Sequence, residues 1–354
     1  MTTLTSSVLA GDRLALARLL TQVENDLPAG HAALNELFLH TGRAHLIGVT
    51  GAPGTGKSSL VNQLARYYRH PPQGALPRRV AVVAVDPSSP FTGGAILGDR
   101  VRMRDLAGDP GVFIRSMAAR GSLGGLAQHT AGVVQVFDAA GYEIILIETV
   151  GAGQAEVDIA RLAHTTLVVE APGLGDDIQA IKAGILEIAD ILIVNKADRP
   201  GVENTERALR GMLQLAHPIP HVFQSSHHHP SLSPQLPTSP PSELLHSPSP
   251  LWTPLILRTV ATEGDGIPEL AAAIEQHRQH LKTSGDWRSR TRARLQAELD
   301  ALIREALVSR WRSSLTDAHY QTILDRLVER EIAPYQAVEE LCREADNSAL
   351  IFYA

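Results

Sequence analysis

Eight consecutive residues restrict the fold of this chain more than any other feature. They read Gly51-Ala52-Pro53-Gly54-Thr55-Gly56-Lys57-Ser58, the G-x-x-x-x-G-K-S pattern of a phosphate-binding loop. The apolar run 46–50 precedes them, and Leu60, Val61 and Leu64 follow at helical spacing. Because such a loop works between a buried strand and the start of a helix, the pattern predicts a strand, a loop and a helix in that order.

The residue types in this loop suit triphosphate binding. Glycines let the backbone curl so that successive N–H groups face phosphate oxygens, and the helix N-terminus adds partial positive charge. We expect Lys57 to reach the β- and γ-phosphates and the Ser58 hydroxyl to ligate Mg²⁺. The predicted phosphate site consists of Gly51, Ala52, Pro53, Gly54, Thr55, Gly56, Lys57, Ser58 and Ser59.

A second motif indicates that the base is guanine. Asn195-Lys196-Ala197-Asp198 directly follows the apolar run 191–194. A carboxylate such as that of Asp198 accepts hydrogen bonds from both the N1–H and the N2 amino group of guanine, a donor pair that adenine lacks. We therefore expect the nucleotide to be GTP or GDP. The predicted base site consists of Asn195, Lys196 and Asp198, with Val260, Ala261 and Thr262 packed on the base.

The segment Glu148-Thr149-Val150-Gly151 is a candidate sensor of Mg²⁺ and the γ-phosphate, because it follows the apolar run 144–147. We expect Glu148 to hold Mg²⁺, mostly through water, and the Gly151 N–H to contact the γ-phosphate. Loss of that phosphate would then release the loop. Gln154 follows shortly and is a candidate to orient the attacking water.

Two further acids, Asp86 and Asp99, are candidates for the same region. Asp86 ends the run 80–85, and Asp99 lies in the segment 93–100. A carboxylate at the carboxyl end of a strand faces the ligand crevice in a parallel sheet. A solvated loop explains the same positions equally well, so the residues alone leave both readings open.

Short apolar runs that alternate with helical stretches indicate the α/β class. Strands buried on both faces have this appearance, so we predict a P-loop NTPase fold with a doubly wound, mainly parallel sheet flanked by helices. The runs are 46–50, 80–85, 144–147, 167–169, 191–194 and 255–260.

Composition and spacing also predict the organisation of the chain. We expect an N-terminal helical segment over 1–42, a GTPase domain over 43–280 and a C-terminal helical dimerisation region over 281–354. In the last region Leu295, Leu299, Leu302 and Ala306 share one helical seam, able to pack on the main domain or on a second subunit. Within the GTPase domain, 217–254 holds 10 of the chain's 22 prolines and is predicted to be a mobile insertion.

The overall composition excludes several classes of protein. The net charge of −6 argues against a nucleic-acid binder that works by bulk charge. The single cysteine, Cys342, excludes an intramolecular disulfide and a Cys-based metal cluster. The N-terminal residues do not have the pattern of a secretory signal, and no run of apolar residues is long enough for a membrane span. We therefore expect a cytoplasmic protein without a membrane partner.

Several long motifs in the right order resemble the ArgK/MeaB GTPases, a family that includes the methylmalonic aciduria type A protein. They are GAPGTGKSS, VDPSSPFTGGAILGDRVRM, IETVGAGQAEVD, PGLGDDIQAIKAGILEIAD and VNKADRPG. The resemblance covers about residues 43–215 and 251–280. It implies a SIMIBI-class P-loop GTPase that forms a homodimer through C-terminal arms. It also implies a chaperone of an adenosylcobalamin-dependent acyl-CoA mutase such as methylmalonyl-CoA mutase, in which GTP hydrolysis gates cofactor loading and protects or reactivates the mutase.

The same resemblance assigns roles to individual residues. Three acids, Asp86, Asp99 and Glu148, would serve the Mg²⁺ and switch network. Together with Ser58 they are the predicted metal-binding residues, and together with Lys57 they are the predicted catalytic residues. The segment 173–182 would match a switch that contacts the mutase. Within it, Asp176, Asp177 and Lys182 become candidates for a salt-bridge relay, although acids are also ordinary at a helix N-terminus.

Two other functions remain open at this point. A metallochaperone GTPase that delivers nickel or cobalt is supported only by the run His227-His228-His229, which a solvated linker also explains. A kinase of a small molecule or protein would use the same phosphate loop. The fate of the γ-phosphate, water or another acceptor, separates a kinase from a GTPase.

Overall fold

The computed structural model describes residues 2–72, 74–87, 103, 105–106, 108–119, 125–149, 160–173, 188–215 and 251–351. Several residues with predicted roles lie outside these ranges, and their roles stay predictions. These residues are Asp99, Gly151, Gln154, Asp176, Asp177, Lys182 and the histidine run 227–229.

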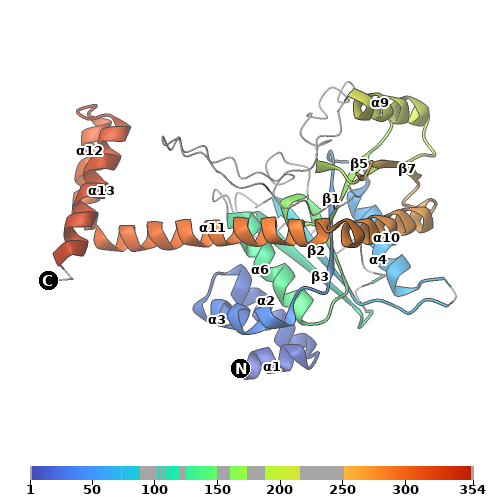
Figure 1. Cartoon of the computed structure of the whole chain (residues 1–354), viewed down its shortest axis with the longest axis horizontal. Helices are drawn as coiled ribbons and strands as arrows, with labels where there is room; N and C mark the ends of the chain where they lie inside the picture. The colour runs from blue at the N-terminus through green and yellow to red at the C-terminus, as the bar shows by residue number, and fades with distance from the viewer. Residues whose placement is uncertain are drawn as a thin grey trace, which may run out of the picture. The chain divides into compact units, whose positions relative to one another are not determined.

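A seven-stranded sheet is formed by strands between residues 45 and 259 (Figure 1). Its strands lie in the order β3-β2-β4-β1-β5-β6-β7, and every pair of neighbours is parallel. The predicted α/β fold is therefore confirmed, with a wholly parallel sheet. The strands are β1 (His45–Thr50), β2 (Val80–Pro87), β3 (Val112–Ala119), β4 (Ile144–Thr149), β5 (Thr165–Glu170), β6 (Ile191–Asn195) and β7 (Leu255–Thr259).

The apolar runs become strands because both of their faces are covered. On one face, Ile47, Leu146 and Ile193 pack against the helices α4 (Lys57–Arg69) and α10 (Ile267–Ser284). On the other face, the strands meet α6 (Gly125–Ala139) and α9 (Val202–Leu215). Side chains alternate between the two faces along each strand, and all six residues of β1 and of β4 are buried.

The edge strand β3 is the one strand that the apolar runs do not predict. Its sequence, VFIRSMAA, is interrupted by Arg115 and Ser116. Only one neighbouring strand, β2, pairs with it. The outer position leaves Arg115 able to reach the N-terminal helices, where its guanidinium forms an ion pair with Glu24. A polar residue is tolerated here because an edge strand is not enclosed on all sides.

Of three N-terminal helices, the second and third pack against α6, and the first packs on those two. They are α1 (Thr3–Leu9), α2 (Arg13–Glu24) and α3 (Pro28–Leu37), and a short 3₁₀ turn, η1 (Phe38–His40), follows them. Asp12 caps α2 by accepting hydrogen bonds from the N–H groups of Leu14 and Ala15. Leu16, Leu19 and other apolar residues of α2 join the core beneath α6. The predicted helical segment is therefore packed on the sheet domain.

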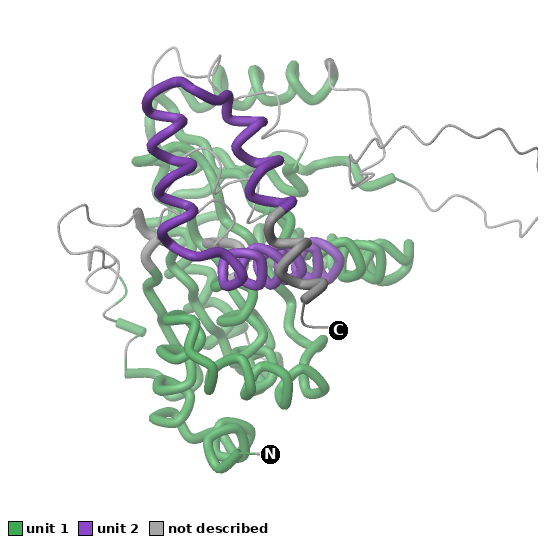
Figure 2. Tube along the Cα trace, turned by 90° about the vertical axis from the view of Figure 1, so that its left-hand side faces the viewer, with its two compact units in different colours: residues 1–294 green, residues 295–354 purple. Residues whose placement is uncertain are grey.

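The chain divides into two compact units, residues 1–294 and 295–354 (Figure 2). The second unit contains most of α11 (Asp286–Ser314) and the helices α12 (Asp317–Val328) and α13 (Pro334–Ile351). Ile323, Ala337 and Leu341 form a small core between α12 and α13. The predicted seam on α11 is exposed: Leu299 is 57% and Leu302 45% accessible. Among the parts of the chain that the structure describes, no helix is both long enough and apolar enough to cross a bilayer.

A single carboxylate holds the chain where it enters the sheet. Asp138, near the end of α6, accepts hydrogen bonds from three consecutive N–H groups, those of Gly42 (2.5 Å), Arg43 (3.1 Å) and Ala44 (3.0 Å). Only 8% of Asp138 is exposed. These bonds fix the segment that leads from η1 into β1 and therefore the start of the strand that carries the phosphate loop.

We predict that Asp138→Asn lowers the free energy of unfolding by about 1–3 kcal/mol. The amide keeps one acceptor oxygen but places an NH₂ group against a backbone N–H, so at least one of the three backbone donors loses its partner. Urea denaturation followed by circular dichroism measures the change. The exposed Asp325→Asn is the matched control and should stay within about 0.5 kcal/mol of the parent. Equal stability of the two variants would contradict the role of Asp138.

Candidate nucleotide site

The loop 51–56 joins the end of β1 to the start of α4, as its pattern predicts. Gly51 has φ = 138°, and a Cβ there would overlap the carbonyl oxygen of Val169 on β5. Gly56 has φ = 96°, and a Cβ there would overlap the side-chain amide of Asn195. Both glycines are therefore required by left-handed backbone and by close neighbours. The curled backbone brings the loop against β5 on one side and the Asn195 region on the other.

Lys57 and Ser58 are the first two residues of α4, and both are buried. The Lys57 Nζ lies inside the curl of the loop and donates hydrogen bonds to the carbonyl oxygens of Gly51 (2.7 Å) and Ala52 (2.9 Å). The Ser58 hydroxyl donates to Glu148 Oε1 at 2.6 Å. The predicted phosphate and metal residues of β1, α4 and β4 are thus brought together at one sheet edge.

Asn195, the last residue of β6, joins the second motif to the phosphate loop. Its Nδ2 donates to the carbonyl oxygen of Thr55 at 2.8 Å. Its Oδ1 accepts from the Thr259 hydroxyl at 3.0 Å and from the Ala261 N–H at 3.1 Å. Because the oxygen faces two donors and the nitrogen faces a carbonyl, the hydrogen-bond network fixes the orientation of the amide. Asn195 is buried, so these bonds are shielded from water.

The neighbouring Lys196 makes a second link to the same loop. It has φ = 58°, and its Nζ donates to the carbonyl oxygen of Gly54 at 2.6 Å. The Ala197 N–H donates to the Thr259 carbonyl at 3.1 Å, which holds the motif against the end of β7. Asp198 follows with an exposed side chain, as does Thr262 on the next loop, whereas Ala261 is buried. The motif therefore presents its carboxylate residue at the surface of this sheet edge.

The acidic residues are described unequally. Glu148 is buried at the end of β4 beside Ser58. The backbone of Asp86 lies near the end of β2, one residue after Val85, which pairs with Thr149 of β4. That register brings the carboxyl ends of β2 and β4 together. Thr149 also donates through its hydroxyl to Thr50 of β1 at 3.2 Å, so the ends of β1 and β4 are joined next to the phosphate loop.

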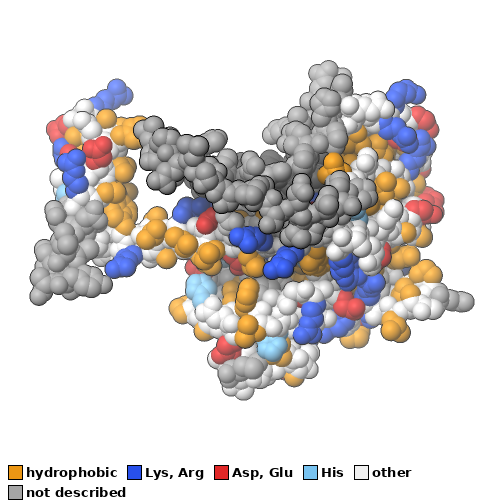
Figure 3. All heavy atoms as spheres, in the orientation of Figure 1, with side chains coloured by type: hydrophobic (Ala, Val, Ile, Leu, Met, Phe, Trp, Pro, Cys, Tyr) orange, Lys and Arg blue, Asp and Glu red, His pale blue; other side chains and the backbone are white. Residues whose placement is uncertain are grey.

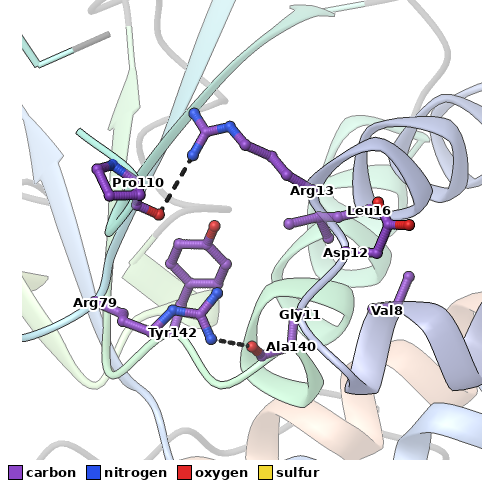
Figure 4. Close-up of a pocket in the computed structure, with 9 residues that line it drawn as sticks. All are labelled: Val8, Gly11, Asp12, Arg13, Leu16, Arg79, Pro110, Ala140 and Tyr142. Atoms are coloured by element: carbon purple, nitrogen blue, oxygen red, sulfur yellow. Dashed lines mark hydrogen bonds between the residues drawn. The ribbon is translucent and has the colours of Figure 1, made fainter. Parts of the chain in front are cut away.

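A small hollow between α2 and the strands lies at the opposite edge of the sheet (Figure 4). Arg79, Pro110 and Tyr142, which line it, all come just before strands. The Arg79 guanidinium lies over the Tyr142 ring at 4.4 Å and donates to the Ala140 carbonyl at 2.7 Å. Arg13, on the facing helix, donates to the Val112 carbonyl at 2.7 Å. These contacts join α2 and α6 to the strands and are far along the strands from the phosphate loop.

Fold and site together define a P-loop GTPase: a phosphate loop between a strand and a helix, a serine beside an acid, and an Asn-Lys-x-Asp motif bonded to the loop. The family model described as "Methylmalonyl Co-A mutase-associated GTPase MeaB" matches residues 16–316. The chain therefore belongs to the MeaB family of GTPases, and the resemblance seen in the sequence is confirmed.

Individual relatives agree with this membership. A predicted GTPase from Pyrococcus abyssi is 41% identical over 96% of this chain and 95% of its own length. The GTPase ArgK of Escherichia coli is 36% identical, covering 78% of this chain and 75% of its own. The crystal structure titled "LAO/AO transport system kinase" has a TM-score of 0.63 and 24% identity, over 96% of this chain and 95% of that one, and so shows the same fold.

Thr259 is a site residue that the motifs did not predict. It lies one residue before the predicted element 260–262, and its hydroxyl is buried against Asn195. A small hydroxyl residue at the carboxyl end of a strand, just before a predicted base-contacting loop, was the available signal. Its partner is 64 residues away in the sequence, so spacing alone could not pair the two.

We predict that Thr259→Val weakens GTP binding about five- to thirtyfold, whereas Thr259→Ser stays near the parent value. Valine keeps the shape of threonine but leaves Asn195 Oδ1 with one donor fewer, at a cost of about 1–2 kcal/mol. Calorimetric titration with GTP measures the affinity. If Thr259→Ser weakened binding as much as Thr259→Val, the methyl group and not the hydroxyl would be the important feature.

Proposed function

We propose that this MeaB-family GTPase is a chaperone of an adenosylcobalamin-dependent acyl-CoA mutase of the methylmalonyl-CoA mutase type. GTP binding and hydrolysis gate cofactor loading and protect or reactivate the mutase. The observation that carries the nucleotide part is the pair of bonds from Asn195 and Lys196 to the phosphate loop. These bonds couple the base-reading motif to the triphosphate cradle. Family membership supports the choice of partner.

Each residue of the cradle has a chemical task in this proposal. The N–H groups of the loop 51–56 and the start of α4 bind phosphate oxygens, because both present positive ends of backbone dipoles. Lys57 Nζ, which donates to the carbonyl oxygens of Gly51 and Ala52, would turn to the β- and γ-phosphates of the bound nucleotide. Asp198 accepts from guanine, and Val260, Ala261 and Thr262 pack on the base.

The donor set beside the loop fits Mg²⁺. The Ser58 hydroxyl and the Glu148 carboxylate lie 2.6 Å apart. Both present hard oxygen ligands, the type that this ion prefers. Ser58 would ligate the ion and Glu148 would hold it mostly through water, with Asp86 and Asp99 completing the set. When bound, Mg²⁺ supplies charge neutralisation on the phosphate oxygens.

We propose that the partner mutase acts through the segment 173–182. Gly173 ends the described part of this segment, with φ = 79°. Asp176, Asp177 and Lys182 would relay the state of the nucleotide to the partner. Because no arginine finger is evident in the sequence, the intrinsic rate is slow and the partner orders the switch residues.

We propose that the protein is a cytoplasmic homodimer, with the helical region 281–354 as its dimerisation arm. Large apolar side chains are exposed along α11 (Figure 3). Exposed apolar side chains in such a row favour a protein partner. The residues are Leu295, Leu299, Leu302, Ile303, Leu307 and Val308. In the same proposal, residues 43–280 are the GTPase domain and residues 1–42 are an N-terminal helical segment.

The first test measures GTP turnover by the purified protein, alone and with each adenosylcobalamin-dependent mutase of the same organism. We predict that one mutase raises the rate about tenfold or more, because ordering a switch is worth far more than that in other GTPases. The released γ-phosphate should appear as inorganic phosphate. Its transfer to another acceptor would instead indicate a kinase.

Two lysine variants control this experiment. Lys57→Ala should abolish GTP binding or turnover, since it removes the cation that faces the phosphates. Lys282→Ala, on α10 and away from the loop, should keep both. Stimulation by no mutase, with tight GTP binding retained, would contradict the chaperone role and leave the GTPase assignment unchanged.

The second test addresses the base. We predict that Asp198→Asn weakens GTP binding by about two orders of magnitude and improves binding of xanthosine triphosphate. Xanthine carries a carbonyl where guanine carries the N2 amino group, so an amide donor suits it and a carboxylate does not. Competition binding with both nucleotides measures the change. The exposed Asp325→Asn should leave the preference for GTP unaltered, and an equal loss of both nucleotides in Asp198→Asn would argue against base reading.

A further inference from the structure

A buried polar network lies at the amino ends of the strands, at the edge of the sheet opposite the phosphate loop. His45 is the first residue of β1, Thr165 the first of β5, and Asp190 directly precedes β6. His277 of α10 lies among them, and all four side chains are almost fully buried. The nucleotide chemistry uses none of these residues.

The four side chains form a continuous chain of contacts. His45 Nε2 is 2.8 Å from the Thr165 hydroxyl, and that hydroxyl is 2.9 Å from His277 Nδ1. His277 Nε2 lies 3.2 Å from Asp190 Oδ1. An imidazole nitrogen next to a carboxylate oxygen carries a proton, since two lone pairs would repel each other.

When the imidazoles are neutral, the proton on His277 Nε2 determines where the other protons of this hydrogen-bonded series lie. His277 Nδ1 then accepts from the Thr165 hydroxyl, whose single proton is thereby used. The hydroxyl oxygen accepts in turn from His45 Nε2–H. His45 Nδ1 is left as a bare lone pair, and it has no hydrogen-bond partner among the described residues.

A second branch depends on His164 in the same way. Its Nδ1 accepts a hydrogen bond from the Leu46 N–H at 3.1 Å, so this nitrogen must be unprotonated. Its ring stacks on that of Trp287, with centroids 3.8 Å apart. The ring of His45 lies 5.9 Å from the same indole. A proton added to His164 Nδ1 would displace the Leu46 N–H and leave that buried donor unsatisfied.

Arg290 ties the start of α11 to this network. Its guanidinium donates to both carboxylate oxygens of Asp190 (2.8 Å each) and to the His164 carbonyl (2.7 Å). α11 contributes no buried residue. The turns 286–294 are therefore attached by hydrogen bonds, charge and ring stacking, whereas β1 and β5 are held by apolar burial on both faces.

The surroundings disfavour additional positive charge. Burial, together with nearby Arg278, lowers the pKa of His45 well below its ordinary value. Burial and Arg294 do the same to the pKa of His164. Although burial by itself raises it, Arg290 and His277 hold the pKa of Asp190 far below its usual range. The charged and titratable groups that face the network are Arg78, Asp190, His277, Arg278, His280, Lys282, Asp286, Arg290 and Arg294.

We propose that this network is an acid-sensitive latch for the start of α11. At neutral pH the uncharged imidazoles of His45 and His164 hold residues 286–294 on the strand ends. At lower pH their protonation releases those turns while the sheet stays folded. The strands persist because their burial is apolar and does not titrate.

The direction of the effect follows from proton linkage. In the opened state an imidazole recovers a pKa of about 6.5, so the open state binds more protons than the closed one below that pH. One such histidine makes the open population at pH 5.5 about tenfold larger than it is at neutral pH, and two histidines make it larger still. Above about pH 7 neither state takes up these protons, and the latch is insensitive to pH.

Hydrogen exchange of the full-length parent protein is the first test, at pH 7.5 and 5.5 with times scaled for the intrinsic exchange rate. Protection of residues 286–294 should fall about tenfold or more at pH 5.5, while β1 and β5 keep their protection. A loss of protection at pH 5.5 that is equal in residues 286–294, β1 and β5 would overturn the proposal, because it would indicate global acid unfolding. Unchanged protection of 286–294 would overturn it as well.

Variants that cannot titrate form the second test. Asparagine places an acceptor oxygen near the position of Nδ1, so His164→Asn preserves a partner for the Leu46 N–H without a proton site. In His164→Asn combined with His45→Gln, the pH-dependent loss at 286–294 should disappear. The exposed His70→Asn is the matched control and should behave like the parent. A parental response in a folded His45→Gln/His164→Asn protein would refute the latch.

Discussion

The nucleotide edge of this protein depends on one buried side-chain amide. Asn195 bonds simultaneously to the Thr55 carbonyl of the phosphate loop and, at the end of β7 and just after it, to the Thr259 hydroxyl and the Ala261 N–H. An amide suits this position because it offers donors on one side and acceptor lone pairs on the other. Rigid coupling matters in the proposed site, since a nucleotide bound there would contact the proposed base loop and the phosphate loop together. The left-handed Gly56 allows the amide to approach, because a Cβ there would overlap it.

The parallel sheet determines where the remaining chemistry gathers. All seven strands run the same way, so the segments that follow β1, β4, β6 and β7 emerge at one edge. Glu148 and Ser58 therefore meet although they are 90 residues apart in the sequence. The opposite edge receives the segments that precede the strands. There the chain buries three imidazoles and Asp190, with Arg290 bonded to that carboxylate, and buried polar atoms need specific partners.

Local patterns predict the nucleotide edge far better than the opposite one. The phosphate loop and the Asn-Lys-x-Asp motif are each contiguous, and each is flanked by an apolar run, so residue order alone identified them. The apolar runs did not predict β3, because Arg115 and Ser116 interrupt its sequence. β3 is the outermost strand of the sheet, where polar residues are tolerated. Local patterns missed two further features for another reason: Thr259, and the network of His45, Thr165 and His277. Their meaning lies in contacts between residues 64 to 120 positions apart, which no local pattern encodes.

Two kinds of attachment therefore coexist in the first unit of the chain. The sheet is held by apolar burial, which is insensitive to pH. The turns 286–294 are held by a carboxylate, a guanidinium and neutral rings, with no buried residue of α11 to assist them. Contacts of the second kind respond to protons and salt much more steeply than contacts of the first kind. Local stability at the start of α11 is thus set by different forces from the stability of the nucleotide site, so conditions that loosen one need not disturb the other.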